Sequence, residues 1–225
     1  MFLQPSQPSP YDIHFGVLGI PVRVTPFFWL ITALLGWSAL DEGPVYLFIW
    51  MLVVFVSILV HEIGHATAAR AFGYPPQILL HQFGGLAMYA PYRDYTLTRS
   101  ILITAAGPLA GLILGGLSIA ASFFTVALAP DPPPQVQAIL SDLIFVNIAW
   151  SLVNLLPVIP MDGGQICRDV LLIFWPRQGL RIALGISLAV AAGVTILAIM
   201  FKQIYIAMMF GFMAFGSLNE LQGRR

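Results

Sequence analysis

Charged side chains are scarce in this chain: Asp, Glu, Lys and Arg make up 9% of its 225 residues, whereas soluble domains carry about 25%. That scarcity excludes an ordinary soluble globule. Hydrophobic residues make up 59% of the chain and its mean hydropathy is +0.88, which indicates a multi-pass membrane protein. Ten basic and ten acidic residues give a net charge of zero, so we expect no nucleic-acid partner.

Cysteine is almost absent. The single Cys167 excludes an intrachain disulfide, and we interpret it as a small apolar residue. We expect no signal peptide, because Met1–Pro10 is polar and rich in proline. We expect residues 1–24 to be a cytoplasmic N-terminal segment. No loop is long enough for an accessory domain, so residues 1–225 are expected to form a single transmembrane domain.

Long apolar runs are abundant, and a helix needs about 20 such residues to cross a bilayer. We predict an α-helical protein with about six transmembrane helices, the first and last of them short enough to be tilted or interfacial. The predicted spans are 25–40, 45–71, 100–128, 138–160, 181–201 and 203–219.

Loop charges predict the orientation of these helices. Arginines cluster in the loops on one side of the predicted topology, as the positive-inside rule requires of the cytoplasmic side. Both termini are therefore expected in the cytoplasm of a cell-membrane protein. The cytoplasmic side holds Arg23, Arg70, Arg93, Arg99, Arg168, Arg177, Arg181, Arg224 and Arg225, and the opposite side holds Asp41, Glu42, Asp131 and at most Lys202.

The segment 77–90 is apolar but too short to span a membrane. Gly84-Gly85 in its middle is a turn signal, so the segment is predicted to be a membrane-associated β-hairpin. A free strand edge there could hydrogen-bond an extended substrate segment. A purely structural hairpin remains the alternative.

The sequence His61-Glu62-Ile63-Gly64-His65 follows directly on the apolar run of residues 46–60. Positions i and i+4 share one helix face, so His61 and His65 can bind one metal ion, with Glu62 as the general base. Ionisable groups are costly in hydrocarbon, which favours a functional role for them. The motif indicates a zinc hydrolase whose active site lies within the membrane. Its alternative is a polar pair that hydrogen-bonds to neighbouring helices.

A catalytic zinc usually takes three protein ligands, and the loop charges leave Asp162 as the acid at the depth of the histidine motif. It follows Pro157 and Pro160, which interrupt the predicted helix, and precedes Gly163-Gly164, which permits a sharp turn. In isolation Asp162 is also compatible with an ordinary turn residue. With the histidine motif present, the ligand interpretation is the stronger one.

The two motifs together, HEIGH and NLLPVIPMDGG, resemble the site-2 protease family of intramembrane zinc metalloproteases. The resemblance implies one zinc per chain held by His61, His65 and Asp162, with Glu62 as the catalytic base. It assigns Asn154 to substrate or oxyanion contact and matches Gly84-Gly85 to a family turn. No PDZ or CBS domain accompanies these motifs.

The implied function is hydrolysis of peptide bonds in transmembrane segments of other membrane proteins within the lipid bilayer. The active site would open toward the cytoplasm. Two alternatives stay open: a divalent-metal transporter that uses the same three ligands, and a catalytically silent membrane scaffold. The transporter leaves Glu62 and Asn154 without a role, and the intact Glu62 argues against the scaffold.

Overall fold

The fold was analysed in a computed structural model, which describes residues 9–90 and 94–223. The chain forms two units: residues 1–92 with 109–151, and residues 93–108 with 152–225. Each unit is described by itself. Three residues of the orientation prediction, Arg93, Arg224 and Arg225, lie outside the described part of the chain.

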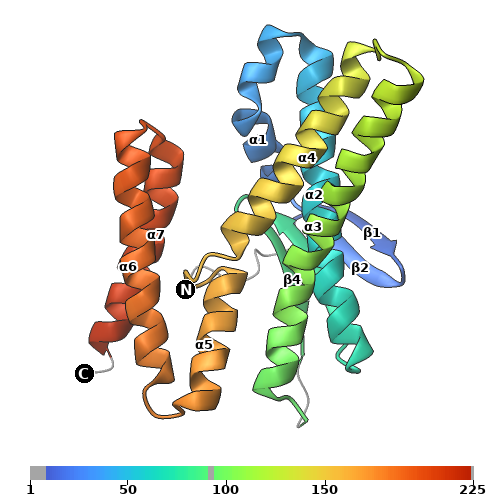
Figure 1. Cartoon of the computed structure of the whole chain (residues 1–225). Helices are drawn as coiled ribbons and strands as arrows, with labels where there is room; N and C mark the ends of the chain where they lie inside the picture. The colour runs from blue at the N-terminus through green and yellow to red at the C-terminus, as the bar shows by residue number, and fades with distance from the viewer. Residues whose placement is uncertain (1–8, 91–93, 224–225) are drawn as a thin grey trace. The chain divides into compact units, whose positions relative to one another are not determined.

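The first unit contains a four-stranded sheet in the order β1-β2-β3-β4 (Figure 1). Its strands are β1 (Ile13–Val17), β2 (Ile20–Val24), β3 (Pro76–His81) and β4 (Gly84–Tyr89). The β1–β2 and β3–β4 pairs are antiparallel, whereas β2 and β3 run parallel. Parallel neighbours need a long crossover, and here it is the chain through α1 (Pro26–Leu35), the 3-10 helix η1 (Trp37–Asp41) and α2 (Pro44–Ala71).

The predicted hairpin at 77–90 is confirmed as β3 and β4, with two differences. The turn is Gln82-Phe83, and Gly84 pairs with His81 as the first residue of β4, so Gly84-Gly85 is not the turn itself. The sheet also includes β1 and β2, which lie within the predicted N-terminal segment 1–24. The alternation of apolar residues at Ile20, Val22 and Val24 was the missed signal, since all three are buried.

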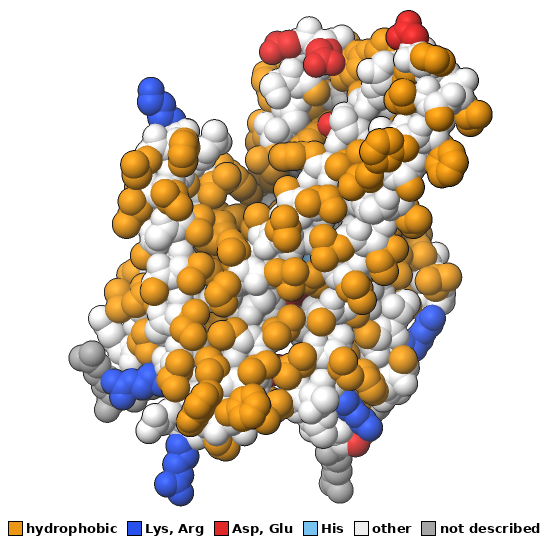
Figure 2. Space-filling model, in the orientation of Figure 1, with side chains coloured by type: hydrophobic (Ala, Val, Ile, Leu, Met, Phe, Trp, Pro, Cys, Tyr) orange, Lys and Arg blue, Asp and Glu red, His pale blue; other side chains and the backbone are white. Residues whose placement is uncertain are grey.

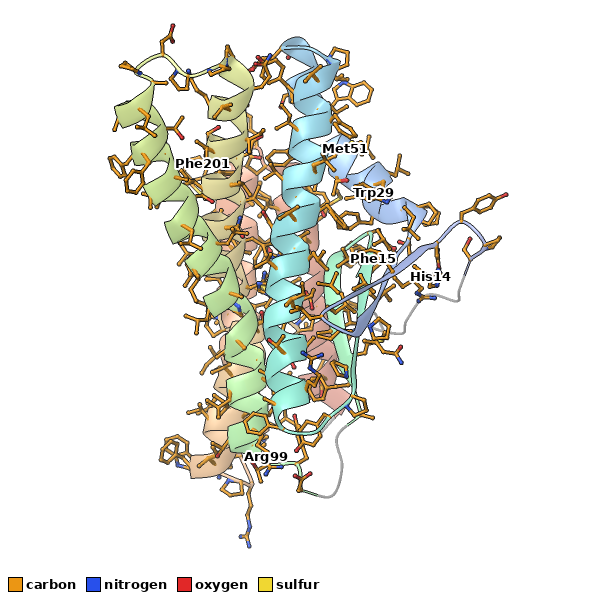
Figure 3. The ribbon with its side chains drawn as sticks, turned by 90° about the vertical axis from the view of Figure 1, so that its right-hand side faces the viewer. His14, Phe15, Trp29, Met51, Arg99 and Phe201 are labelled. Carbon is orange, nitrogen blue, oxygen red and sulfur yellow. The ribbon has the colours of Figure 1, made fainter. Side chains whose placement is uncertain are left out.

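Helix α2 packs on this sheet through one face. Val53, Ile58 and Ala66 of α2 share a buried apolar cluster with Val22 and Ile78 of the sheet. An aromatic group closes the cluster beside α1, where the ring centroids of Trp29 and Phe15 lie 5.2 and 6.3 Å from that of Phe55. Figure 3 shows Phe15 and Trp29 on the side of α2 that carries the sheet. The sheet and α2 therefore form one packed body.

Five described helices, rather than the expected six, are long and apolar enough to cross a membrane. They are α2, α3 (Leu97–Leu128), α4 (Pro134–Asn154), α6 (Gly179–Met200) and α7 (Ile204–Gly223). The predicted first span, 25–40, is instead the 10-residue α1 followed by η1. Gly36 follows α1 directly, and a Cβ there would lie 2.5 Å from Trp50 Nε1, so the indole occupies the space a side chain would need.

The apolar faces of these helices are largely uncovered, as lipid-facing helices require. Phe123, Phe124 and Phe145 are each more than 60% exposed on α3 and α4, and Figure 2 shows hydrophobic side chains over the helices. The exposed Asp41, Glu42 and Asp131 lie in the connections of α1 to α2 and of α3 to α4. A band of apolar surface below acidic connections fits a membrane protein.

The second unit contains α5 (Asp162–Phe174), α6 and α7 (Figure 1). Helix α4 ends at Asn154, and residues 155–161 form an irregular segment that includes both prolines, which confirms the predicted interruption. Asp162 begins α5, a helix that lies between the predicted spans 138–160 and 181–201. Trp175 follows its last residue and precedes Pro176, as expected where proline bars the helical conformation of the residue before it.

Candidate metal centre

His61 and His65 lie one turn apart on α2 and are both buried, at 3% and 8% exposure. Their Nε2 atoms are 3.1 Å apart, and the rings meet edge to face with centroids separated by 4.8 Å. Two nitrogens bound to a tetrahedral zinc at about 2.0–2.1 Å lie about 3.3 Å apart. The imidazole pair therefore fits two positions of one zinc ion.

Glu62 lies between these histidines in sequence and is 5% exposed. Its carboxyl packs directly against the backbone of strand β4, because a Cβ at Gly85 would lie 2.5 Å from Glu62 Oε1 and 2.6 Å from its Cδ. Only glycine permits this approach. The fold thus holds the candidate base against the strand, and Gly85 has a steric role in place of the turn role predicted for it.

Strand β4 is the last strand of the sheet, so only β3 pairs with it among the described residues. Gly85 pairs with Leu80 of β3 on its inner side. The opposite edge can accept an extended peptide by strand addition. Gly84, with φ of 116°, begins this strand, and a Cβ there would lie 3.1 Å from the Trp150 ring. Both glycines therefore let β4 approach neighbouring side chains closely.

Asp162 belongs to the second unit, where it is the first residue of α5 and is buried. The two glycines after it are helical and do not make a turn. They allow α5 to press against the preceding backbone: a Cβ at Gly163 would lie 2.6 Å from Leu156 O, and one at Gly164 would lie 2.5 Å from Ile159 N. Its predicted role as the third zinc ligand, beside His61 and His65 of the first unit, stays a prediction.

Asn154, the last residue of α4, also belongs to the second unit. Its predicted contact with substrate or an oxyanion stays a prediction.

Sequence reasoning missed a buried polar contact beside the motif. Asn147 of α4 donates through Nδ2 to Ser57 Oγ of α2 over 2.8 Å, and both residues are 2% exposed. Ser57 precedes His61 by one helical turn and lies on the same face of α2. This hydrogen bond joins α2 to α4 next to the first histidine. The signal was available as a serine at i−4 from His61.

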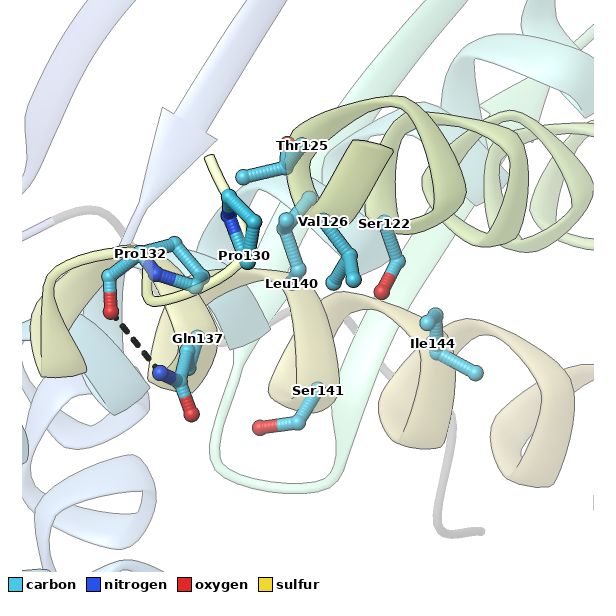
Figure 4. Close-up of a pocket in the computed structure, with 9 residues that line it drawn as sticks. All are labelled: Ser122, Thr125, Val126, Pro130, Pro132, Gln137, Leu140, Ser141 and Ile144. Carbon is cyan, nitrogen blue, oxygen red and sulfur yellow. Dashed lines mark hydrogen bonds between the residues drawn. The ribbon is translucent and has the colours of Figure 1, made fainter. Parts of the chain in front are cut away.

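A separate hollow of about 340 Å³ lies between α3 and α4 near their connection (Figure 4). Serine, threonine and glutamine side chains line it with apolar groups, and Gln137 Nε2 donates to Pro132 O over 2.8 Å. No His, Cys, Asp or Glu is among its lining residues. The hollow therefore lacks the groups for acid–base or metal chemistry.

Comparison with known proteins gives related sequences and a related solved structure. No protein-family model matches the chain. A zinc metalloprotease of Methanocaldococcus jannaschii is 28% identical over 215 residues, which are 93% of this chain and 60% of that protein. A candidate zinc metalloprotease of Synechocystis sp. is 34% identical over 173 residues, 71% of this chain and 44% of that protein. The chain thus spans less than two thirds of both.

A solved site-2 protease from Methanocaldococcus jannaschii matches with a TM-score of 0.67 and 27% identity, over 94% of this chain and 95% of that one. The match extends along nearly the whole chain, so it includes the elements of both units. These likenesses confirm the family resemblance predicted from the two motifs, and they confirm the helical membrane fold with a small sheet.

Proposed function

We propose, from the relationship of this chain in sequence and fold to the site-2 protease family, that it is an intramembrane zinc metalloendopeptidase. The observation that carries the proposal is the packing of Glu62 between two features: the His61–His65 pair on its own helix and the edge strand β4 against its carboxyl. A peptide added to that strand would run beside a base and a metal pair. Metal transport requires no such strand.

One zinc ion per chain would be held by His61, His65 and Asp162. The donor types support this set, because two imidazoles and one carboxylate are ligands that catalytic zinc uses while keeping a position open for water. The bound ion supplies a water of lowered pKa and polarises the scissile carbonyl. Burial of the two histidines keeps competing water away from them.

Glu62 would accept the proton of the attacking water at a carboxylate oxygen and deliver it to the leaving amine. Its position against Gly85 fixes the carboxyl so that it need not search for a productive rotamer. Asn154 would donate through its amide to the developing oxyanion or to a substrate carbonyl. In these roles Glu62 is a carboxylate that does not bind the metal, and Asn154 is an amide that donates through its nitrogen.

The substrate would be a transmembrane segment of another membrane protein, taken in extended form. A helical peptide bond is hydrogen-bonded within its own helix, so the segment must unwind before it is cut. Backbone groups released in the bilayer need new partners, and the open edge of β4 offers them. The active site would open toward the cytoplasm, which the arginine-rich loops support.

The proposal is tested with purified protein in detergent and in vesicles. Metal analysis should give one zinc per chain for the wild type and none for the His61→Ala/His65→Ala double variant. His14→Ala is the matched control, because His14 is exposed on β1 and should leave zinc unchanged. Cleavage of a transmembrane reporter should depend on zinc. Zinc flux across the vesicles without any cleavage would instead establish a transporter.

A further inference from the structure

In the second unit, two buried serine hydroxyls form a hydrogen-bonded chain that ends at a backbone amide three residues before Asp162. The N–H of Ile159 donates to Ser187 Oγ of α6 over 2.9 Å, and Ser187 Oγ lies 2.8 Å from Ser217 Oγ of α7. Ser187 is fully buried and Ser217 is 3% exposed. Because Ser187 accepts the amide proton, its own hydroxyl proton is available to Ser217.

The segment 155–161 has few backbone N–H groups that can bond it to other elements. Pro157 and Pro160 carry no N–H. The N–H groups of Val158 and Met161 bond within the segment, to Leu156 O and Val158 O, both over 2.7 Å. Ile159 is different because its N–H reaches a side chain on another element. An amide buried without an acceptor is costly, so Ser187 fixes the position of this segment on α6.

Apolar packing follows the same line. Val158 is fully buried in a cluster with Ala191 of α6 and Phe210 of α7. Ala191 lies one turn after Ser187, and Phe210 lies two turns before Ser217, so each pair shares a helix face. The segment therefore packs against both α6 and α7, through the apolar contacts of Val158 and the hydrogen bond of Ile159 to Ser187.

We propose that Ser187 and Ser217 are positioning residues for Asp162, which follows the anchored amide of Ile159 by three residues. The inference rests on the proposed function, in which Asp162 is a zinc ligand. Loss of the serine contacts would free the segment and let the carboxylate drift from its place. Partners that orient metal ligands typically change metal affinity by about 10- to 100-fold when removed.

Zinc affinity of the full chain, measured by competition with a chelator, tests this. Ser187→Ala should weaken zinc binding about 10-fold, and Ser217→Ala should weaken it less, because the Ile159 bond remains. The double variant should match Ser187→Ala, since Ser217 acts only through Ser187. Hydrogen exchange of the zinc-free protein adds a readout without metal: the amides of residues 158–161 should exchange faster in Ser187→Ala.

Thr195→Val is the control, because among the described residues the Thr195 hydroxyl on α6 bonds to Ala191 O of its own helix, over 2.8 Å. It should change neither measurement. The inference is overturned if Ser187→Ala keeps wild-type zinc affinity and exchange while Asp162→Ala loses zinc. Wild-type affinity in Asp162→Ala would refute the ligand set itself, and the inference with it. Should Ser187→Ala fail to fold, Ser217→Ala decides by the same two measurements.

Discussion

At the scale of single residues, the position of Glu62 depends on the absence of a side chain at Gly85. The carboxyl fills the space that a Cβ would take, so the sheet and the candidate base are fitted to each other. A general base must be held within hydrogen-bond reach of the proton it takes. Gly85 is therefore as much a part of the site as the charged groups, although it has no chemistry of its own.

Gly85→Ala should slow cleavage strongly and leave zinc binding intact. The added methyl would displace the Glu62 carboxyl, and a misplacement of about 1 Å costs on the order of a hundredfold in rate. Reporter cleavage and metal analysis on the same preparation check this. Gly116→Ala, at a glycine with no neighbouring atom within 4 Å of an added Cβ, should cleave normally. A Gly85→Ala protein of wild-type rate would remove the steric role.

Asn154→Ala should bind zinc like the wild type and cleave about a hundredfold or more slowly, the usual cost of losing one oxyanion donor. Zinc content and reporter turnover together decide the point. Wild-type turnover would reduce Asn154 to a helix-packing residue. Loss of zinc would show that the division between ligands and substrate contacts is wrong.

The sequence predicts which residues make up the candidate site better than it predicts what the glycines beside them do. HEIGH alone marks His61, Glu62 and His65, because a helix has a fixed period. The glycines at 85, 163 and 164 were predicted as turn formers, yet each serves a close approach. Close approach depends on how the chain folds back, onto Glu62 for Gly85 and onto residues 155–159 for Gly163 and Gly164, and a glycine alone does not show this.

At the scale of elements, the contact between α5 and the segment before it is made by backbone atoms. Gly163 and Gly164 meet carbonyl and amide atoms of residues 155–159, not flexible side chains. Backbone cannot move aside without disrupting the whole segment. The position of the start of α5, and with it Asp162, therefore depends on the absence of side chains at Gly163 and Gly164.

Gly163→Ala should lower stability by about 1–3 kcal/mol, the usual cost of overpacking, whereas Gly116→Ala should raise it by up to about 1 kcal/mol through helix propensity. Thermal unfolding of the zinc-free protein in detergent measures both. The opposite signs are the prediction, and equal shifts for the two variants would contradict it.

Element prediction succeeded where length and hydropathy decide. The predicted span 45–71 is α2 within one residue at its start, since a long apolar run has no other stable form in lipid. It failed for α5, whose 13 residues are too few for a search based on spans. It also missed two of the four strands. Both β1 and β2 are only five residues long, so alternation is the only signal that marks them.

At the scale of the whole molecule, the proposed topology puts Arg177 and Asp131 on opposite sides of the membrane. Both residues are exposed. In a Cys167→Ala background, Arg177→Cys should react with an impermeant thiol reagent from the cytoplasmic side and Asp131→Cys from the other. Labelling of both from one side would contradict the topology.

In the wild-type chain, the native cysteine should itself react slowly with such a thiol reagent. Burial raises the pKa of the Cys167 thiol, so little thiolate is present at neutral pH, and the thiolate is the reactive form. The wild-type chain should therefore label more slowly than either engineered cysteine at pH 7, and should approach their rate only as the pH rises. Equal rates at pH 7 would show that the thiol is more accessible than the fold places it.

In the proposed mechanism Glu62 acts as the base of a zinc endopeptidase. The most direct test compares wild type with Glu62→Gln, which keeps the size of the side chain but cannot accept the proton. Both proteins are reconstituted with a transmembrane reporter, and zinc content and released fragments are measured on the same vesicles. The account predicts equal zinc in both and cleavage that falls by about a hundredfold or more in Glu62→Gln. Equal zinc with equal cleavage would contradict it.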